Sequence, residues 1–475
     1  MKIAVLADFG STFTKVSLVE LGTGRLVGNG QAPTTAESDV MNGYRAAVAD
    51  ALAASEQDIE IEARLAASSA GGGLRVAAVG LVEELTAAAA RQAGLNAGAR
   101  VALVLSGRLS DQDRHALELA DPDIVLFSGG TDDGQRRLVL ENAEVVAHAR
   151  IDAHFVVACN TDVAPQVAQL LAAAGRQVAV VENVLPQIST LNVAPAREAI
   201  GHAFLHHVIA GKGLSASDEF ARIVMMPTPE AVLTATELLA RGADDVSGWA
   251  EAVVIDVGGA TTDVHSVADS KRTTPGVNLP LLPILPVLRT VQGDLGLRSS
   301  AASVLEQDRA WIVNTLSPAY DSDQVDHAVS ERVRDPAFVP VGDDWAVDCA
   351  LATSCLAHAL ERHCGRLTIR VRPNQEVRFS VDGPDLREAS VVIGTGGILS
   401  HNPRASDIVR VALDRCDAQA LIPKNPRVVI DRAYILAAAG LLATIDRAAA
   451  LSLINSQLRG CQPPGTESRA PARTH

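Results

Sequence analysis

The sequence predicts an α/β protein with more than one domain, and three observations support this fold class. Its 475 residues exceed one ordinary core, because a domain commonly holds about 100–200 residues. Residues 62–185 alternate apolar strands with helical stretches, as in a parallel sheet covered by helices. Two stretches of similar sequence, 3–19 and 253–264, lie roughly half a chain apart, and each predicts a strand, a glycine turn and a second strand.

The first of these hairpins begins almost at the N-terminus. Residues 3–6 predict an apolar strand and residues 16–19 the returning strand, joined by the turn Asp8-Phe9-Gly10-Ser11-Thr12-Phe13-Thr14-Lys15. Residues 25–28 are expected to add a third strand. A serine and an aspartate then suit the N-cap of a helix over 39–53.

The alternating region comes next, and its strands end in short polar loops. The expected strands are 75–79, 101–105, 124–127, 155–158 and 178–181, and the expected helices are 82–93, 111–120, 135–147 and 162–174. The loops are 68–73, 106–107, 128–132 and 160–162. Ligands of open α/β sheets bind at the carboxyl ends of strands, so these loops either line a second pocket or only connect the elements.

The second hairpin follows two expected helices, 195–209 and 229–241, and carries the most informative turn. Its sequence is Asp256-Val257-Gly258-Gly259-Ala260-Thr261-Thr262-Asp263. The glycines allow backbone N–H groups to approach an anion, and the threonines add hydroxyl donors. Asp256 offers the hard oxygen that Mg²⁺ prefers. This stretch therefore predicts a site for phosphate and a metal ion.

The rest of the chain is expected to alternate in the same way. Helices are predicted over 300–316 and 349–363, a third strand-to-glycine turn over 391–399, and a helix of small residues over 432–449. Residues 460–475 are rich in Pro, Gly, Ser and Arg, which predicts a disordered tail.

Composition narrows the functional class. A net charge of −15 argues against attraction to nucleic acid or to an anionic membrane surface. The six cysteines form no Cys-x-x-Cys pair, which argues against a redox motif or a zinc ribbon and favours reduced thiols in the cytoplasm. An aspartate interrupts the first apolar segment, so no signal peptide is expected, and no apolar run reaches the roughly 18–20 residues of a membrane span.

The three glycine turns resemble the two phosphate motifs and the adenosine motif of the actin/Hsp70/sugar-kinase ATPase superfamily, in order and in spacing. The third turn is Ile393-Gly394-Thr395-Gly396-Gly397. The resemblance implies a two-domain actin-like ATPase (ribonuclease H-like) fold with an α/β region inserted at about 62–185. We expect the first domain over 1–245, the second over 246–455 and the disordered tail over 456–475. The helices at 229–241 and 432–449 would connect the two domains, the latter packing back toward the first.

Within that superfamily the chain to about residue 455 resembles the glutamate mutase (methylaspartate mutase) accessory proteins, called MutL or GlmL. The matching stretches are 7–15, 68–75, 128–132 and 289–296, the last reading Arg289-Thr290-Val291-Gln292-Gly293-Asp294-Leu295-Gly296. The family implies a chaperone or reactivating role toward an adenosylcobalamin-dependent mutase. Its subunits are the implied partners, and self-association stays open.

The resemblance also assigns roles to residues, with ATP and Mg²⁺ as cofactors and Mg-dependent ATP hydrolysis as the activity. Phosphate contacts would come from Gly10, Ser11, Thr12, Gly258, Gly259 and Thr261, and the adenosine turn would be Gly394, Thr395, Gly396 and Gly397. Asp8 and Asp256 would hold Mg²⁺ through waters, Asp256 would also orient the attacking water, and Lys15 would be a phosphate cation. Asp263 either helps to polarise water or only supports the returning strand.

Two other functions remain open. A small-molecule kinase of the same superfamily would need a base and a substrate pocket that the sequence does not reveal. A scaffold subunit would bind nucleotide without turnover, and the two aspartates at the turns argue mildly against it. A dehydratase activator would need cysteines grouped for an iron–sulfur cluster, and the cysteines here are scattered.

Weaker motifs are interpreted as structural. Gly211-Lys212-Gly213 lacks the spacing of a phosphate-binding Walker loop, and His202 with His206 and His207 lacks the glutamate of a zinc protease motif. The group Cys355, His358, His363 and Cys364 matches no recognised zinc spacing.

Overall fold

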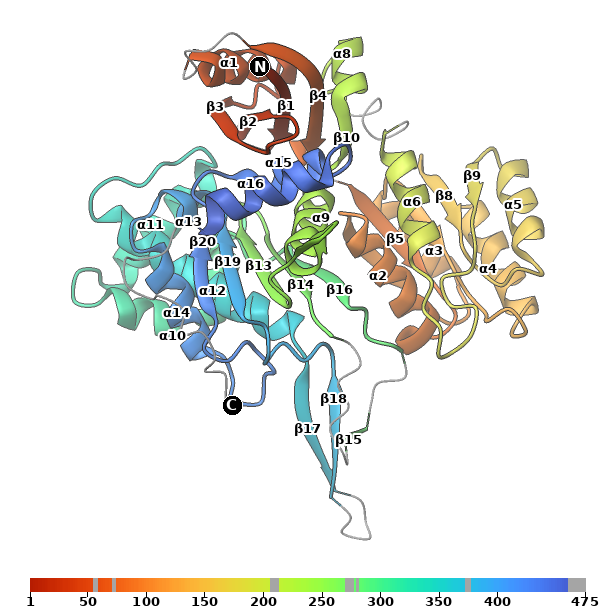
Figure 1. Cartoon of the computed structure of the whole chain (residues 1–475). Coiled ribbons are helices and arrows are strands. Elements are labelled where there is room, and N and C mark those ends of the chain that lie inside the picture. Colours follow the sequence, from red (N-terminus) through yellow and green to blue (C-terminus); the bar gives the residue numbers. More distant parts are fainter. Residues whose placement is uncertain are drawn as a thin grey trace, which may run out of the picture.

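The computed structural model (Figure 1) describes residues 1–53, 59–70, 74–205, 213–269, 277–278, 282–371 and 377–459. The predicted Lys212, His206 and His207 and the tail over 460–475 lie outside these residues. Three five-stranded sheets organise the described part, two of them alike and the third inserted between elements of the first.

The first sheet has the order β10-β4-β1-β2-β3. Its strands are β1 (Lys2–Phe9), β2 (Phe13–Glu20), β3 (Leu26–Pro33), β4 (Glu60–Ser68) and β10 (Val224–Pro227). β1, β2 and β3 run antiparallel, whereas β4 pairs parallel to β1 and β10 parallel to β4. Helices α1 (Val40–Ala53) and α8 (Asp218–Ile223) flank this sheet, and Phe9 packs against Tyr44 and Phe220.

The second sheet repeats this topology in the order β16-β14-β13-β19-β20. Its strands are β13 (Ala252–Val257), β14 (Thr262–Val267), β16 (Val287–Gln292), β19 (Val391–Thr395) and β20 (Arg427–Ile430). One face is covered by α10 (Ala301–Leu316), α11 (Ser322–Arg334), α12 (Asp344–His363), α13 (Gly397–His401) and α14 (Ala405–Arg415). The repeated topology confirms the predicted two-domain actin-like fold with an inserted α/β region.

Three helices lie between the two repeated sheets (Figure 1): α9 (Thr228–Arg241), α15 (Ile435–Leu442) and α16 (Arg447–Arg459). Their apolar residues form one core with the inner faces of both sheets. The single helix predicted over 432–449 is wrong, because α15 begins only at Ile435 and ends at Leu442, and a separate helix, α16, begins at Arg447. The tail predicted from 456 also begins too early, since Leu458 is buried on α16.

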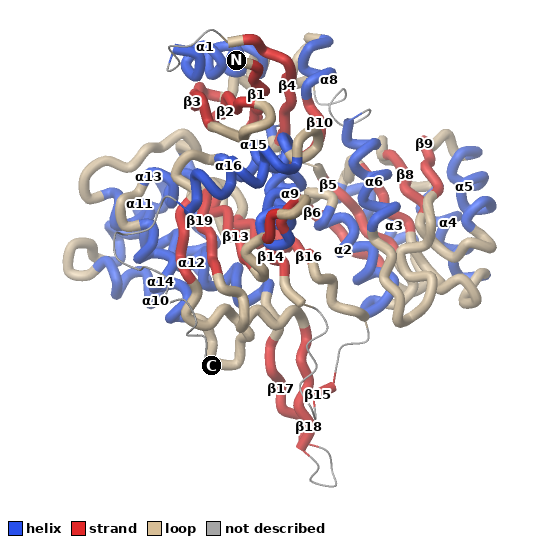
Figure 2. Tube along the Cα trace, in the orientation of Figure 1, coloured by secondary structure: helices blue, strands red, loops and turns tan. Residues whose placement is uncertain are grey.

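The inserted sheet is parallel throughout, in the order β6-β5-β7-β8-β9. Its strands are β5 (Arg75–Val79), β6 (Arg100–Leu105), β7 (Ile124–Phe127), β8 (His154–Val157) and β9 (Gln177–Val180). The helical elements are η2 (Glu83–Ala87), α2 (Ala88–Asn96), α3 (Asp111–Ala120), α4 (Arg137–Ala147), α5 (Ala164–Ala173) and α6 (Ala194–Ala203). In Figure 2 this unit stands beside the two repeated sheets.

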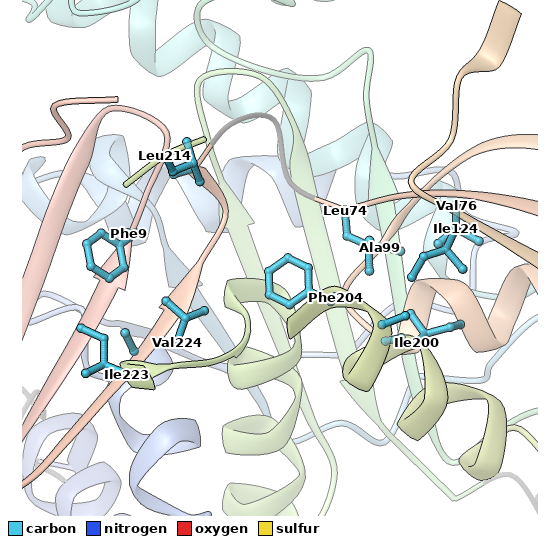
Figure 3. Close-up of a cluster of buried hydrophobic side chains, with 14 of the residues drawn as sticks. Phe9, Leu74, Val76, Ala99, Ile124, Ile200, Phe204, Leu214, Ile223 and Val224 are labelled. Carbon is cyan, nitrogen blue, oxygen red and sulfur yellow. The ribbon is translucent and has the colours of Figure 1, made fainter. Parts of the chain in front are cut away.

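The predicted limits of the insert, 62–185, need correction at both ends. Residues 60–68 form β4 and pair with β1, so they belong to the first sheet. At the other end α6 packs on the insert beyond residue 185, and its Ile200 shares a core with Val76 and Ile124. Figure 3 shows this core running on to Phe9 and Val224 of the first domain. The insert is therefore anchored to the first domain by continuous apolar packing.

Short strands complete the fold. β11 (Gly242–Ala243) pairs with β12 (Val246–Ser247) after α9. β17 (Arg366–Val371), β18 (Val377–Asp382) and β15 (Val277–Asn278) form a small sheet that projects from the second domain (Figure 1). Among the described helices, none is both long and apolar enough to cross a membrane.

Candidate functional site

A cavity of about 430 Å³ lies between the two repeated sheets and is lined by the tips of both hairpins. Many of the predicted site residues meet in it: Asp8, Gly10, Ser11, Thr12 and Lys15 from the first hairpin, Asp256, Gly258 and Gly259 from the second, and Gly396 and Gly397 from the third turn. Thr261, Gly394 and Thr395 are not among its lining residues. Ser69, from the polar loop that follows β4, also faces the cavity.

The two hairpins close in the same way, which explains why they carry similar sequences. The backbone N–H of Gly10 donates to the carbonyl of Phe13 at 3.2 Å, and that of Gly258 donates to the carbonyl of Thr261 at 2.9 Å. A Cβ on Gly10 would lie 2.6 Å from the Phe13 carbonyl oxygen, so the first turn excludes a side chain there. Each tight turn leaves its following backbone groups at the edge of the cavity, where an anion would meet them.

The third turn is brought beside the second hairpin by parallel pairing of β13 with β19, in which Asp256 lies opposite Thr395. Gly396 has φ 96°, and a Cβ there would lie 2.3 Å from the Val257 carbonyl oxygen and 2.9 Å from Asp256 Oδ1. Glycine is required at this position on both counts. Gly394 instead packs among the apolar side chains of Leu399 and Ile430, inside the second domain.

Asp8 and Asp256 approach the cavity from opposite domains. The hydroxyl of Thr228, at the start of α9, donates to Asp8 Oδ1 at 2.5 Å. Burial raises the pKa of Asp8, against the opposing effect of Lys15. Burial also raises the pKa of Asp256 to about 7, and the carboxylates of Asp263 and Asp8 add to this shift. Two crowded carboxylates of this kind would be stabilised by a cation.

These carboxylates fit the donor set expected for Mg²⁺. The ion prefers oxygen ligands and usually keeps several waters, so one or two carboxylates are enough. The described residues contain no group of three or more His, Cys, Asp or Glu side chains arranged around one metal position. Mg²⁺ held here would therefore rest on Asp8, Asp256 and waters.

Lys15 lies beside Asp8 and also reaches the second domain. It stands opposite Asp8 in the register of β1 and β2, and its Nζ lies 3.6 Å from the centre of the Tyr434 ring. Tyr434 has φ 54° just before α15, and its ring lies 5.7 Å from that of His401. The ammonium group therefore occupies the seam between the domains, at the level of the carboxylates.

Asp263 is engaged within the protein. It stands opposite Asp256 in the register of β13 and β14, so the two carboxylates share one face of the sheet. The Nε and Nη2 of Arg289 donate to Asp263 Oδ1 at 2.9 and 2.5 Å, and the hydroxyl of Thr261 donates to Oδ2 at 3.2 Å. Asp263 does not line the cavity, and both its oxygens accept hydrogen bonds from this chain.

Sequence reasoning missed several residues of the cavity. The backbone N–H groups of Leu297 and Arg298 donate to the carbonyls of Gly258 and Gly259 at 3.1 and 2.7 Å, which holds the second turn in place. Arg298 lies two residues after the 289–296 stretch, and this closeness to a matching stretch is the signal that could have identified it. Tyr434 and an apolar wall that includes Phe338 and Trp345 complete the cavity. Their segments carry no recognisable motif.

Polar side chains in the loops of the inserted sheet hydrogen-bond to backbone carbonyls of the insert. The hydroxyl of Ser128 donates to the carbonyls of Val79 and Thr86 at 2.6 and 3.0 Å. The amide of Asn160 donates to the carbonyl of Thr131 at 2.7 Å. Of the two interpretations of these loops, the structure favours connections that close the sheet. Residues 71–73 of the loop after β4 lie outside the described part of the chain.

Comparison with known proteins gives consistent matches over most of the chain. Residues 4–458 match the model of the family described as MutL protein. "Protein MutL" of Clostridium tetanomorphum is 39% identical over 446 residues, which cover 93% of this chain and 96% of that protein.

Similar solved structures are much more distant in sequence. A nucleotide-free acetone carboxylase aligns with 14% identity and a TM-score of 0.39, over 93% of this chain and 70% of that one. A ROK family glucokinase of Streptomyces griseus aligns with 12% identity and a TM-score of 0.30, over 96% and 99% of the two chains. A glycerol dehydratase reactivase aligns with 13% identity and a TM-score of 0.32, over 93% and 99%.

Proposed function

Since this chain belongs to the MutL protein family, we propose that it is a cytoplasmic, Mg-dependent ATPase that serves as a chaperone or reactivating factor for an adenosylcobalamin-dependent mutase of the glutamate or methylaspartate type. One observation carries the ATPase part of this proposal. Two hairpins from separate domains, with the same closing hydrogen bond, place Asp8 and Asp256 at one cavity.

Each side of the cavity supplies a different part of the chemistry. Backbone and hydroxyl donors of Gly10, Ser11 and Thr12 would bind the terminal phosphates from the first domain, and Gly258 and Gly259 would approach them from the second. Asp8 and Asp256 would hold Mg²⁺ through waters, and the metal would neutralise phosphate charge. Asp256 would accept a hydrogen bond from the attacking water and so orient it.

The adenosine side would be formed by the third turn. Gly396 and Gly397 leave room for the nucleoside against the backbone, because neither carries a side chain into the cavity. The ammonium group of Lys15 would leave the Tyr434 ring and place its positive charge close to the phosphates.

Turnover of Mg·ATP tests the enzymatic part. Asp256→Asn removes the carboxylate that orients water, and we expect ADP release to fall by about 10²–10⁴-fold. Asp407→Asn is the matched control, because the Asp407 side chain is 71% exposed on α14 and lies outside the cavity. Wild-type protein that neither binds nor hydrolyses Mg·ATP, alone or with a mutase, would exclude the proposal.

The partner is tested with an inactivated cobalamin mutase. We expect the wild-type chain to restore mutase activity only when Mg·ATP is present, and Asp256→Asn to lose this effect. ADP release that depends on a metabolite instead would favour the small-molecule kinase. An Asp256→Asn protein that restores the mutase fully would favour a scaffold subunit.

A further inference from the structure

Arg289 is a fully buried cation that contacts two separate parts of the fold. It lies on β16, and its side chain is 2% exposed. On one side Nε and Nη2 donate to Asp263 in the second hairpin. On the other side Nη1 donates to the carbonyls of Leu95 and Ala99, each at 2.8 Å, at the end of α2 in the insert. One guanidinium group therefore hydrogen-bonds to both the second hairpin and the inserted unit.

The backbone of β16 is bound to the insert as well. β16 is the edge strand of the second sheet, so its outward backbone groups need partners. The Asn96 side chain accepts from the N–H of Arg289 at 3.1 Å and donates to the carbonyl of Val287 at 3.0 Å. Asn96 is buried and is the last residue of α2. β16 and α2 are thus joined by directional hydrogen bonds in addition to apolar packing.

The two hairpins explain why this cation is needed. Lys15 stands opposite Asp8 in the first hairpin, whereas Asp263 stands opposite Asp256 at the equivalent position of the second. The second hairpin therefore presents two carboxylates where the first presents a carboxylate and an ammonium group. Arg289 supplies the missing positive charge from the next strand, and it neutralises Asp263 from outside the cavity. Asp256 then remains the carboxylate available to the nucleotide site.

We propose that Arg289 is a positioning residue that couples the ATP site to the inserted α/β unit, so that movement of the second hairpin on nucleotide binding is transmitted through Asp263 and Arg289 to α2. This inference rests on the proposed ATPase function. The path is short and rigid, since Arg289 joins Asp263 to the end of α2 without an intervening side chain. α2 in turn packs on β5, β6 and α6, which are other elements of the insert.

Hydrogen–deuterium exchange with and without Mg·ATP tests the coupling in the full chain. In the wild type we expect nucleotide to change exchange in both hairpins and also over 88–105. Arg289→Lys keeps the charge but cannot bond Asp263 and two carbonyls at once. In this variant we expect the response over 88–105 to fall at least threefold, while the response of residues 8–15 persists.

Two further variants separate coupling from loss of stability. Arg332→Lys alters an equally buried arginine whose partners, Asp348 and the carbonyls of Ala328 and Asp344, all lie within the second domain. It should keep the response over 88–105. Asn96→Ala removes the side-chain hydrogen bonds to the backbone of β16 but leaves the pair of Arg289 and Asp263 intact. It should lower the response over 88–105 partially. If Arg289→Lys does not fold, the exchange response of Asn96→Ala over 88–105 tests the coupling instead.

The outcomes distinguish failure of the coupling through Arg289 from failure of the proposed ATPase function. A wild-type response confined to the two hairpins, or an undiminished response over 88–105 in Arg289→Lys and Asn96→Ala, overturns the coupling and leaves the ATPase in place. No response in either hairpin, together with no ATP turnover, overturns both.

Discussion

At the scale of single residues, the site depends on how the charge of each carboxylate is compensated. Asp8 accepts a hydrogen bond from Thr228 and faces Lys15. Asp263 is held by Arg289. Asp256 is the least compensated of the three, because its hairpin partner is another carboxylate. A carboxylate that faces another carboxylate in this way is suited to bind a cation and to act on water.

The raised pKa of Asp256 predicts a dependence of stability on pH. Its pKa is about 7 in the folded protein, against 3.8 for an unperturbed aspartate. Between these values the folded chain keeps a proton that the unfolded chain releases, so stability falls as pH rises from about 4 to 7. Asp256→Asn removes this penalty, and we expect it to stabilise nucleotide-free protein at pH 8 by about 1–4 kcal/mol, since one pKa unit corresponds to about 1.4 kcal/mol.

Thermal unfolding at pH 5 and pH 8 measures this effect. The gain from the substitution should shrink toward pH 5, where the wild-type carboxyl is mostly protonated. A variant that is less stable than the wild type at pH 8 would show that Asp256 makes contacts in the free protein that outweigh its burial.

At the scale of elements, the crossing of α9 and α15 determines how the domains are joined. Gly440 on α15 lies directly against the backbone of α9, and a Cβ there would lie 1.9 Å from the carbonyl oxygen of Ala231. The two helices can approach this closely only because α15 has no side chain at that point.

Gly440→Ala should therefore destabilise the protein although alanine is the better helix former. We expect a loss of about 1–3 kcal/mol from overpacking, measured by urea unfolding. Gly201→Ala on α6 is the matched control, because the nearest atom to its added Cβ would be Glu230 Oε2 at 3.9 Å. That change should be neutral or slightly stabilising. Equal effects of the two substitutions would contradict the close helix contact.

At the scale of the whole molecule, one cavity draws on both repeated domains, so bound nucleotide would hold them together. A ligand that binds only the folded state stabilises it by about 2.7 kcal/mol at 100 times its Kd. We expect Mg·ATP to raise the Tm accordingly, and Mg²⁺ alone to have a much smaller effect. Asp8→Asn should reduce the shift, because it removes one of the two carboxylates. An unchanged Tm at saturating Mg·ATP would argue against a site formed by both domains.

Those parts of the fold and of the site that are encoded in consecutive residues could be predicted without a structure. A strand, a tight turn and a returning strand are encoded in consecutive residues, so both hairpins could be found, and most of the predicted site residues line the cavity, including Asp8, Asp256 and Gly396. The repeated topology followed from recognising the same local pattern twice. The boundaries near 62, 185 and 456 could not be found in this way, because alternation and composition do not reveal which sheet β4 joins or which core α6 and α16 pack against.

The groups that complete the site from distant parts of the chain could be identified only from the folded molecule. Thr228, Arg298 and Tyr434 come from segments without a motif, and they reach the cavity because separate elements converge there. The partners of Arg289 are also distant in sequence: Asp263 lies on β14 of the second sheet and Leu95 on helix α2 of the insert, and the buried guanidinium needs such partners. Such contacts depend on packing between elements, and packing is a property of the assembled fold that local sequence does not contain.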